Sequence, residues 1–545
     1  MLTQTSNGTT DFVLQLIPIQ DGDDRYAIAL HDAISKAHVR NGFSKRQFTK
    51  DKILDAINEK VGAIFCDAKR VYIEQSYDET VWKDMVSRYY VHLYPNTSNK
   101  VIRVHLFDSD ISEIRINTKD GSIDEEIRKC YLGYFNIRPV NNLSTLVSYV
   151  MPNYINIKIR NGGLPAKNLV YHRDVHMSGA TLGIDTFPFF FRDEITTVCA
   201  HADILMIARY LYRKFHFSKL TYRDIVDDTS IDKLSIFPTR GISERQILNI
   251  FLGNKIIVRE YDGSICNDAH KLDLEEIGEF VFSQIDSNVP VLLLVREHVV
   301  LIVGATRFDY CRLRNGAERQ LVVYDDSSDL LNNIYNTPSL NMPKKMKYIG
   351  LMKWSEIVYT TCEKFGGELS VIVPLLPWVN TDFFALMTLI TKGELFNRDA
   401  RFDFRRVFTM EVYEVKDAIL KYFDVCDYKT DEIGVDGNPN PNTLDQFLAE
   451  KIANSFLRND SSRYFWCLEI PRPRKPRSIE TISFDYYFFD TNSDAKNIID
   501  ICVNYVDENS PFIKEALLVY GGNEVTRRIR DKPIIIPFTS LQQIN

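Results

Sequence analysis

The chain has 545 residues, more than one hydrophobic core usually serves, so about three domains are expected. Hydrophobic residues make up 45% and charged residues 26%, a balance that excludes a disordered chain. The net charge is −7 and no long basic block is present, so nucleic acid is not expected as a partner. The nine cysteines include no C-x-x-C pair, which indicates reduced thiols instead of a disulfide framework.

The chain carries no sign of export or membrane insertion. Its first residues lack the basic and apolar regions of a signal peptide. No apolar run reaches the roughly 18 residues that would span a bilayer. The longest candidate, residues 289–305, is interrupted by Arg296, Glu297 and His298. We therefore expect a cytoplasmic protein with no membrane partner.

The first part of the chain mixes helix and strand patterns. Residues 24–39 and 44–61 have the apolar spacing of amphipathic helices, whereas residues 101–107 alternate like a half-buried strand. Residues 134–139 predict another strand, which ends at a proline that cannot continue a ladder. Glycine and proline at 162–165 then break both patterns, so an N-terminal α/β domain is predicted over residues 1–163.

A second boundary falls near the proline-containing basic stretch 341–345, which predicts a central domain over residues 164–338. The C-terminal part, 339–545, is again α/β in pattern. It has helix patterns at 383–395 and 442–456 and strand patterns at 464–470 and 482–489. The basic stretch 471–477 lies between these strands and is interpreted as a charged hairpin loop. The predicted fold class is thus α/β throughout, in three domains.

Cys199 occupies a position in the sequence that favours a reactive thiol. It follows Thr196 and Thr197, either of which is an acceptable N-cap, and precedes apolar residues at helical spacing. Cys199 is therefore expected in the first turn of a buried helix. Unsatisfied N–H groups and the positive end of the helix dipole favour a thiolate there, and the thiolate is the nucleophilic form. The alternative is a purely structural role, in which Cys199 is a small buried side chain that packs at the start of a helix.

A histidine and an acid follow at suitable places. Apolar runs at 289–295 and 299–304 bracket polar residues and predict a buried antiparallel hairpin whose second strand opens with His298. Residues 321–324 predict a third strand that ends in Asp325 and Asp326. A carboxylate at that strand end would accept the imidazole N–H and orient the ring. Since strand residues alternate faces, only one of the two acids should point at His298, and the pattern alone leaves open which one.

This order of cysteine, helices, hairpin histidine and strand-end acid resembles the papain-like cysteine peptidases, most closely the compact bacterial branch that includes the double-glycine leader peptidases. The resemblance covers about 150 residues and implies a papain-like domain with Cys199 as nucleophile, His298 as base and Asp325 as orienting acid. It also implies hydrolysis of a peptide or isopeptide bond without cofactor or metal, in a bacterial protein with a regulatory or defence role. A glycine followed by a helix at 241–247, with a Ser243–Gln246 capping box, fits the same family.

One family feature is replaced. The glutamine that helps form the oxyanion hole about six residues before the cysteine corresponds to Asp193. The hydroxyls of Thr196 or Thr197, or the backbone N–H of Cys199, would have to donate instead. Two alternatives therefore stay open. The domain is a degenerate scaffold that only binds a peptide or partner protein, or it transfers the acyl group to an amine instead of water.

Two further patterns have features of metal sites. His172 and His176 have H-x-x-x-H spacing, but Arg173 replaces the glutamate of the metalloprotease motif and the flanks favour a loop. His201 and Asp203 lie close to Cys199, but residues two apart point to different sides of a helix. Both are expected to line the helix surface near the cleft. No metal or other cofactor is expected.

Overall fold

The computed structural model describes residues 2–4, 10–19, 25–39, 49–93, 97–140, 143, 146–153, 166–192, 199–229, 242–264, 271–296, 298–306, 318–327, 330–331, 348–376, 406–414, 463–472, 483–490, 501–504 and 534–537. They form two compact units. The first comprises Met1–Ile277, Val289–Arg307 and Gln320–Pro374. The second comprises Gly278–Asn288, Phe308–Arg319 and Leu375–Asn545. Within the described residues no helix is long and apolar enough to cross a membrane.

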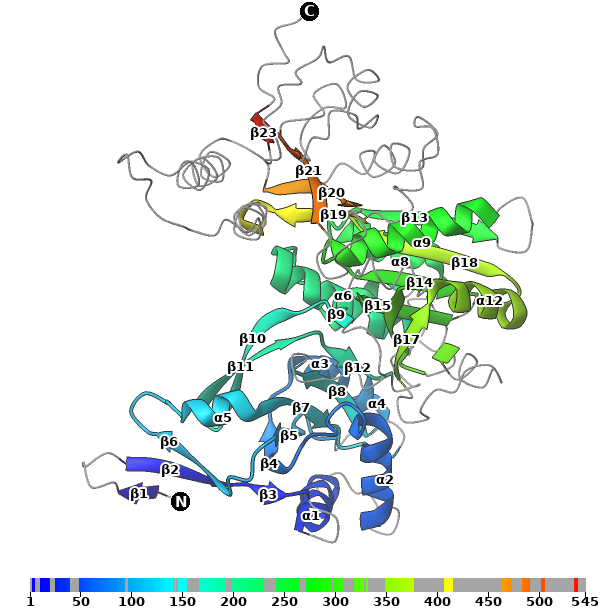
Figure 1. The fold of residues 1–545 in the computed structure, drawn as a ribbon. Coiled ribbons are helices and arrows are strands. Elements are labelled where there is room, and N and C mark those ends of the chain that lie inside the picture. Colours follow the sequence, from blue (N-terminus) through cyan, green and yellow to red (C-terminus); the bar gives the residue numbers. More distant parts are fainter. Residues whose placement is uncertain are drawn as a thin grey trace, which may run out of the picture. The chain divides into compact units, whose positions relative to one another are not determined.

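The amino-terminal part of the first unit is built on a six-stranded antiparallel sheet with strand order β12-β8-β7-β5-β4-β3 (Figure 1). A three-stranded sheet, β1-β2-β6, and a β10-β11 hairpin accompany it. The strands are β1 (Leu2–Gln4), β2 (Thr10–Gln15), β3 (Ile17–Pro18), β4 (Arg70–Tyr77), β5 (Val101–Phe107), β6 (Glu113–Asn117), β7 (Tyr131–Ile137), β8 (Val147–Pro152), β10 (Tyr171–Met177), β11 (Ala180–Thr186) and β12 (Phe189–Phe190).

The helices of this part are α1 (Arg25–Val39), α2 (Lys50–Val61), α3 (Thr80–Met85), the π-helical turn η1 (Val86–Tyr90), α4 (Val91–Leu93) and α5 (Glu125–Cys130). The predicted helix 24–39 is confirmed as α1. The second predicted helix begins at Lys50, because Thr49 caps it by accepting a hydrogen bond from the backbone N–H of Lys52. The strand predicted at 101–107 is confirmed as β5, but it is buried along its whole length instead of half-buried. It lies inside the sheet, between β4 and β7.

A second sheet carries the candidate site. Its order is β13-β18-β14-β15-β16-β17, with β9 paired to β15, and every described pairing in it is antiparallel. The strands are β9 (Ala166–Asn168), β13 (Val258–Ser264), β14 (Val291–Val295), β15 (His298–Thr306), β16 (Gln320–Tyr324), β17 (Ile349–Lys353) and β18 (Glu368–Pro374). The accompanying helices are α6 (Cys199–Phe215), α7 (Tyr222–Thr229), α8 (Glu244–Gly253), α9 (Lys271–Asp286) and α12 (Trp354–Phe365).

The sheets do not follow the predicted domain boundaries. Strands β17 and β18 come after residue 338 and yet complete the second sheet. Strand β12 comes after residue 163 and yet pairs with β8 in the first sheet. Long-range strand pairing joins these segments, and local glycine and proline signals do not reveal it. Whether residues 1–163, 164–338 and 339–545 fold as three domains stays a prediction.

The second unit contains a five-stranded antiparallel sheet, β19-β20-β21-β22-β23. Its strands are β19 (Arg406–Glu411), β20 (Tyr464–Arg472), β21 (Ser483–Asp490), β22 (Ile501–Asn504) and β23 (Ile534–Pro537). The strands predicted at 464–470 and 482–489 are thus present and pair as β20 and β21. The predicted helices 383–395 and 442–456, and most of the basic loop, lie outside the described residues. The chain as described is a mixture of helices and antiparallel sheets.

Candidate functional site

His298 stands at the start of β15, as the sequence predicted. Val295 pairs with His298 across the β14-β15 hairpin, so only Arg296 and Glu297 connect the two strands. Arg296 has a φ of 55°, in the left-handed region that tight hairpin turns use. Because β15 is paired on both sides by β14 and β16, the backbone of His298 belongs to a rigid, buried element.

Asp325 reaches His298 because of the register between β15 and β16. Leu301 pairs with Tyr324, so the next residue, Asp325, lies diagonally across from His298. The Nε2 atom of His298 is 3.0 Å from Oδ1 of Asp325. Of the two adjacent acids at this strand end, Asp325 is thus one that bonds to His298, as the resemblance implied.

Asp325 is fully buried and surrounded by donors. The backbone N–H and the hydroxyl of Ser327 donate to Oδ1, at 3.2 and 3.0 Å. The backbone N–H groups of Leu330 and Leu331 donate to Oδ2, at 2.8 and 3.1 Å. Burial alone would raise the pKa of Asp325, but the hydrogen bond and charge of His298 and these further donors lower that pKa overall. Asp325 is therefore ionised, and His298 Nε2 carries the proton of their hydrogen bond.

Ser327 was not anticipated from the sequence. Besides its two bonds to Asp325, its hydroxyl lies 3.3 Å from Nε2 of His298. One sequence signal could have indicated this contact. An aspartate side chain often accepts a hydrogen bond from the backbone N–H two residues further on, and Ser327 stands two residues after Asp325. Ser327 thus holds Asp325 and His298 in one arrangement.

Cys199 is the first residue of α6, as predicted, but its side chain lies outside the described residues. Helix α6 packs against β15, the strand that His298 opens (Figure 1). One turn after Cys199, Asp203 interacts electrostatically with Asp326 and Asp325.

The expectation that His201 and Asp203 line the surface of the helix was wrong. His201 and Asp203 do not line an exposed cleft surface, since they are 0% and 1% exposed. The apolar residues around them, including Ile204 and Ile207, show that α6 is buried on nearly all sides. Asp193, Thr196 and Thr197, considered for the oxyanion hole, lie outside the described residues.

His172 and His176 lie on strand β10 instead of in a loop. Both are exposed on the same face of the β10-β11 hairpin, since residues four apart along a strand point the same way. His172 bonds to Asp185 at 2.9 Å and His176 to Thr181 at 3.1 Å. In the described part of the chain, no group of three or more histidine, cysteine or acidic side chains is arranged to hold a metal ion.

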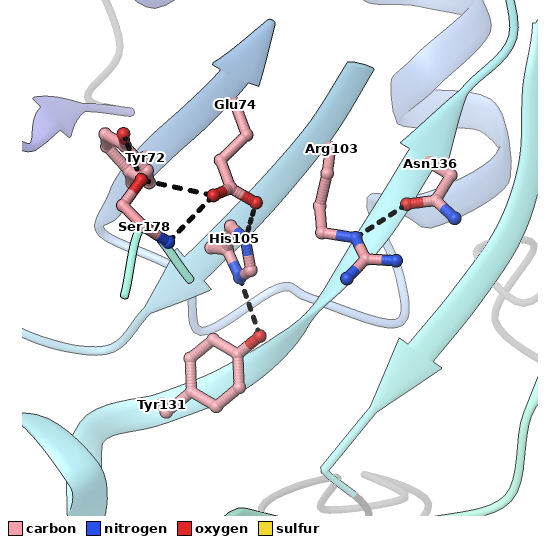
Figure 2. A network of polar contacts seen from close by, with 7 residues as sticks. All are labelled: Tyr72, Glu74, Arg103, His105, Tyr131, Asn136 and Ser178. Carbon is pink, nitrogen blue, oxygen red and sulfur yellow. Dashed lines mark hydrogen bonds and ion pairs between the residues drawn. The ribbon is translucent and has the colours of Figure 1, made fainter. Parts of the chain in front are cut away.

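A second buried histidine, His105 on β5, lies in a polar network of the first sheet. Figure 2 shows its ring between Glu74 and Tyr131. Nε2 is 3.1 Å from the Glu74 carboxylate, and Nδ1 is 2.8 Å from the Tyr131 hydroxyl. Burial lowers the pKa of His105 despite the Glu74 carboxylate, so the ring is neutral, Nε2–H donates to Glu74, and Tyr131 donates to Nδ1. Because His105 and Tyr131 are both fully buried, substrate cannot reach this acid–histidine–hydroxyl chain, and we assign it a structural role.

No family model matches the chain, and no curated protein sequence matches it. Among solved structures, a similar chain is UfSP from C. elegans, with 12% sequence identity and a TM-score of 0.26. The match covers 48% of this chain and 47% of that chain, about half of each. A likeness at this level identifies neither a family nor an activity.

Proposed function

We propose that the chain is a papain-like cysteine peptidase that hydrolyses a peptide or isopeptide bond with Cys199, His298 and Asp325. The observation that carries the proposal is the buried His298–Asp325 pair, with its 3.0 Å hydrogen bond at the end of a central strand. A carboxylate bonded to one ring nitrogen fixes the tautomer and leaves the other nitrogen to act as a base. Nε2 faces Asp325, so Nδ1 is the nitrogen assigned to the chemistry.

In the proposed reaction Nδ1 of His298 takes the proton of the Cys199 thiol, and the thiolate attacks the scissile carbonyl carbon. The carbon–nitrogen bond then breaks while His298 returns the proton to the leaving amine. A thioester remains on Cys199. Water, deprotonated by His298, attacks this thioester and releases a carboxylic acid and the free thiol. Asp325 stays ionised throughout and stabilises the imidazolium.

The position of α6 supports the assignment of Cys199. Asp203 follows Cys199 on α6 and interacts electrostatically with Asp325, which bonds to His298. Helix α6 also contacts β15, the strand that His298 opens, which supports the choice of Cys199. The first turn of a helix also lowers the pKa of a thiol, as a nucleophile requires.

A binding function without catalysis is the second candidate, and Asp193 favours it. An ionised carboxylate cannot donate to an oxyanion, so a peptidase must use the threonine hydroxyls or the Cys199 N–H instead. If none of these donates, the same domain binds a peptide or partner protein and does not cleave it. Transfer of the acyl group to an amine is a variant of the catalytic proposal.

The bacterial branch of the family, a regulatory or defence role and independence of any cofactor are proposed from the resemblance in the order of the three residues. A cytoplasmic location is proposed because the sequence shows no signal-peptide pattern and no apolar run long enough to span a bilayer. The substrate is proposed to be a peptide or protein, with no nucleic acid or membrane partner. The segments that flank residues 164–338 are proposed to select or restrain that substrate, since a catalytic core of this size offers little binding surface.

Incubation of the full chain with a peptide library, analysed by mass spectrometry, tests the proposal. We expect cleavage that disappears in Cys199→Ala and falls by about 10²-fold or more in His298→Ala. An added primary amine that appears on the products would assign acyl transfer. Binding of peptides without cleavage, equal in wild type and Cys199→Ala, would replace the peptidase with the binding scaffold.

A further inference from the structure

Arg103, in the middle of β5, is a buried cation without an acidic partner. The residue is 2% exposed, and its guanidinium carbon lies 3.3 Å from the ring centroid of Tyr77 and 3.9 Å from that of Tyr134. Its Nε donates to Oδ1 of Asn136 at 3.0 Å, which is its one hydrogen bond within the residues that the structure describes. Aromatic faces stabilise a cation but do not accept the N–H groups at the edge of its plane. The remaining donors of this buried guanidinium therefore need an acceptor.

The acid nearest to Arg103 in the sheet binds other groups. Glu74 of β4 stands directly across from Arg103 in the register of the two strands. Its carboxylate instead lies 3.1 Å from Nε2 of His105 and 2.9 Å from the backbone nitrogen of Ser178. Figure 2 shows these contacts of Glu74 beside the separate contact of Arg103 with Asn136. Since Glu74 is occupied, the charge of Arg103 is not balanced by an ion pair with a described acid.

The amide of Asn136 supplies a second donor without an acceptor. Asn136 pairs with Arg103 across β5 and β7 and is fully buried. Because its Oδ1 accepts from Arg103, the orientation of the amide is fixed and Nδ2 is left as the donor. Nδ2 is buried and has no acceptor among the described residues. Buried polar groups are nearly always hydrogen-bonded, so an unpaired amide beside an unpaired guanidinium indicates a ligand that accepts from both.

The guanidinium is not sealed from solvent. Nη1 and Nη2 of Arg103 make no hydrogen bond in the described structure, and neither is among its fully buried polar atoms without a partner. Both terminal nitrogens therefore retain some exposure, whereas Nε and the amide of Asn136 lie deeper. This small exposure admits a compact ligand and excludes a large one.

The surrounding face of the sheet adds positive charge. Tyr134 and Asn136 share a face of β7, and Arg103 shares it through its pairing with Asn136. The β10-β11 hairpin covers this face, since its turn residue Ser178 bonds to Glu74 and β11 contacts β7 and β8. Arg173, on the buried side of β10, interacts electrostatically with Tyr134. A second guanidinium thus lies near the same tyrosine as Arg103, which favours an anion.

We propose that Arg103 and Asn136 bind a small oxyanion, a carboxylate or phosphate group, on the sheet face beneath the β10-β11 hairpin. The two Nη groups of Arg103 donate to two oxygens of the anion in the fork geometry that guanidinium favours, and Nδ2 of Asn136 donates to the same anion. Tyr77 and Tyr134 hold the plane of the guanidinium between their rings. The site belongs to the first sheet and does not depend on the proposed peptidase.

Thermal unfolding of the full chain tests the site with simple anions. The midpoint is measured at pH 7 in sodium phosphate and in sodium acetate, each against sodium chloride of equal ionic strength. An anion that binds the folded chain raises the midpoint as its concentration passes its Kd. A larger rise in phosphate would assign a phosphate group, and a larger rise in acetate would assign a carboxylate. Midpoints that equal those in chloride for both anions would overturn the site.

Two variants separate binding at this site from the general stabilisation of proteins by phosphate, which is excluded from their surfaces. Arg103→Lys keeps the charge but loses the fork, so the anion should bind about tenfold more weakly or worse. Asn136→Asp places a carboxylate beside Arg103, so it should abolish the response to the anion, and it serves where Arg103→Lys does not fold. Arg115→Lys, an exposed arginine of β6, is the matched control and should respond as wild type. A response that is equal in wild type, Arg103→Lys and Asn136→Asp would overturn the proposal.

Discussion

Asp203 and Asp325 show how donors decide the protonation of a buried carboxyl. Both side chains are buried, and burial favours the neutral form of each. Asp325 accepts hydrogen bonds from a histidine, a hydroxyl and three backbone N–H groups, which lower its pKa. Asp203 has no such donor among the described residues. Asp325 therefore stabilises the fold above an unfolded pKa near 3.9, and this contribution is lost as the pH falls through the lower folded pKa.

Ser327→Ala tests how much of the His298–Asp325 geometry depends on a single hydroxyl. The substitution removes the 3.0 Å hydrogen bond from Oγ to Asp325 and keeps the one from the backbone N–H. The free energy of unfolding should fall by about 0.5–1.5 kcal/mol. The kcat/KM for a cleaved peptide should fall by less than about tenfold, against about 10²-fold or more for Asp325→Ala. Urea denaturation and peptide hydrolysis measure the two quantities.

The comparison is informative only for protein that is folded, so both variants are first checked by circular dichroism. A loss of kcat/KM in Ser327→Ala as large as that in Asp325→Ala would contradict a supporting role. The Ser327 hydroxyl would then have to act on His298 directly, from its distance of 3.3 Å.

At the scale of elements, the β10-β11 hairpin is fastened to the first sheet by its turn. Ser178, in that turn, has a φ of 46°, and its backbone N–H donates to Glu74 of β4 at 2.9 Å. Its hydroxyl is 3.1 Å from the same carboxylate and 2.8 Å from the hydroxyl of Tyr72 (Figure 2). Glu74 in turn accepts from His105, so one carboxylate links β4, β5 and the hairpin. The hairpin leads to β12 and then towards α6.

His105→Gln tests this network through its pH dependence. Burial lowers the pKa of His105, so the neutral ring stabilises the fold above an unfolded pKa near 6.5. That stabilisation is lost as the pH falls towards the folded pKa. Between pH 7 and 5 the free energy of unfolding of the wild type should therefore fall more steeply than that of a chain without a titrating group at position 105. The difference should be up to about 1.4 kcal/mol per pH unit. Glutamine retains a donor and an acceptor but does not titrate.

The measurement is the free energy of unfolding of wild type and His105→Gln at pH 7, 6 and 5. His176→Gln, an exposed histidine of β10, is the control and should keep the wild-type slope. If the stability of His105→Gln depended on pH as steeply as that of the wild type, the neutral, structural role of His105 would be contradicted.

At the scale of the whole chain, local sequence patterns predicted individual helices and strands better than they predicted which strands pair with one another. The hairpin at His298, the strand before Asp325, the start of α6 at Cys199 and the capping box of Ser243 and Gln246 all follow from residues near in sequence. The sequence did not predict that β17 and β18 join the sheet of β14 and β15, because pairing across many residues leaves no local signal. The burial of Asp203 was not predicted either. A polar residue on an amphipathic helix is normally exposed, and nothing in the local sequence shows that this helix is buried on nearly all sides.

The central claim is that Cys199 and His298 act as one nucleophile and base, and the pH dependence of Cys199 alkylation tests it most directly. Iodoacetamide labelling at Cys199 is followed by peptide mass spectrometry in wild type, His298→Ala and the control His176→Ala. A thiolate paired with His298 predicts labelling well below pH 8.5, the usual pKa of a thiol, that is lost in His298→Ala and kept in His176→Ala. A Cys199 that titrates near pH 8.5, or resists labelling, equally in all three proteins would contradict the peptidase.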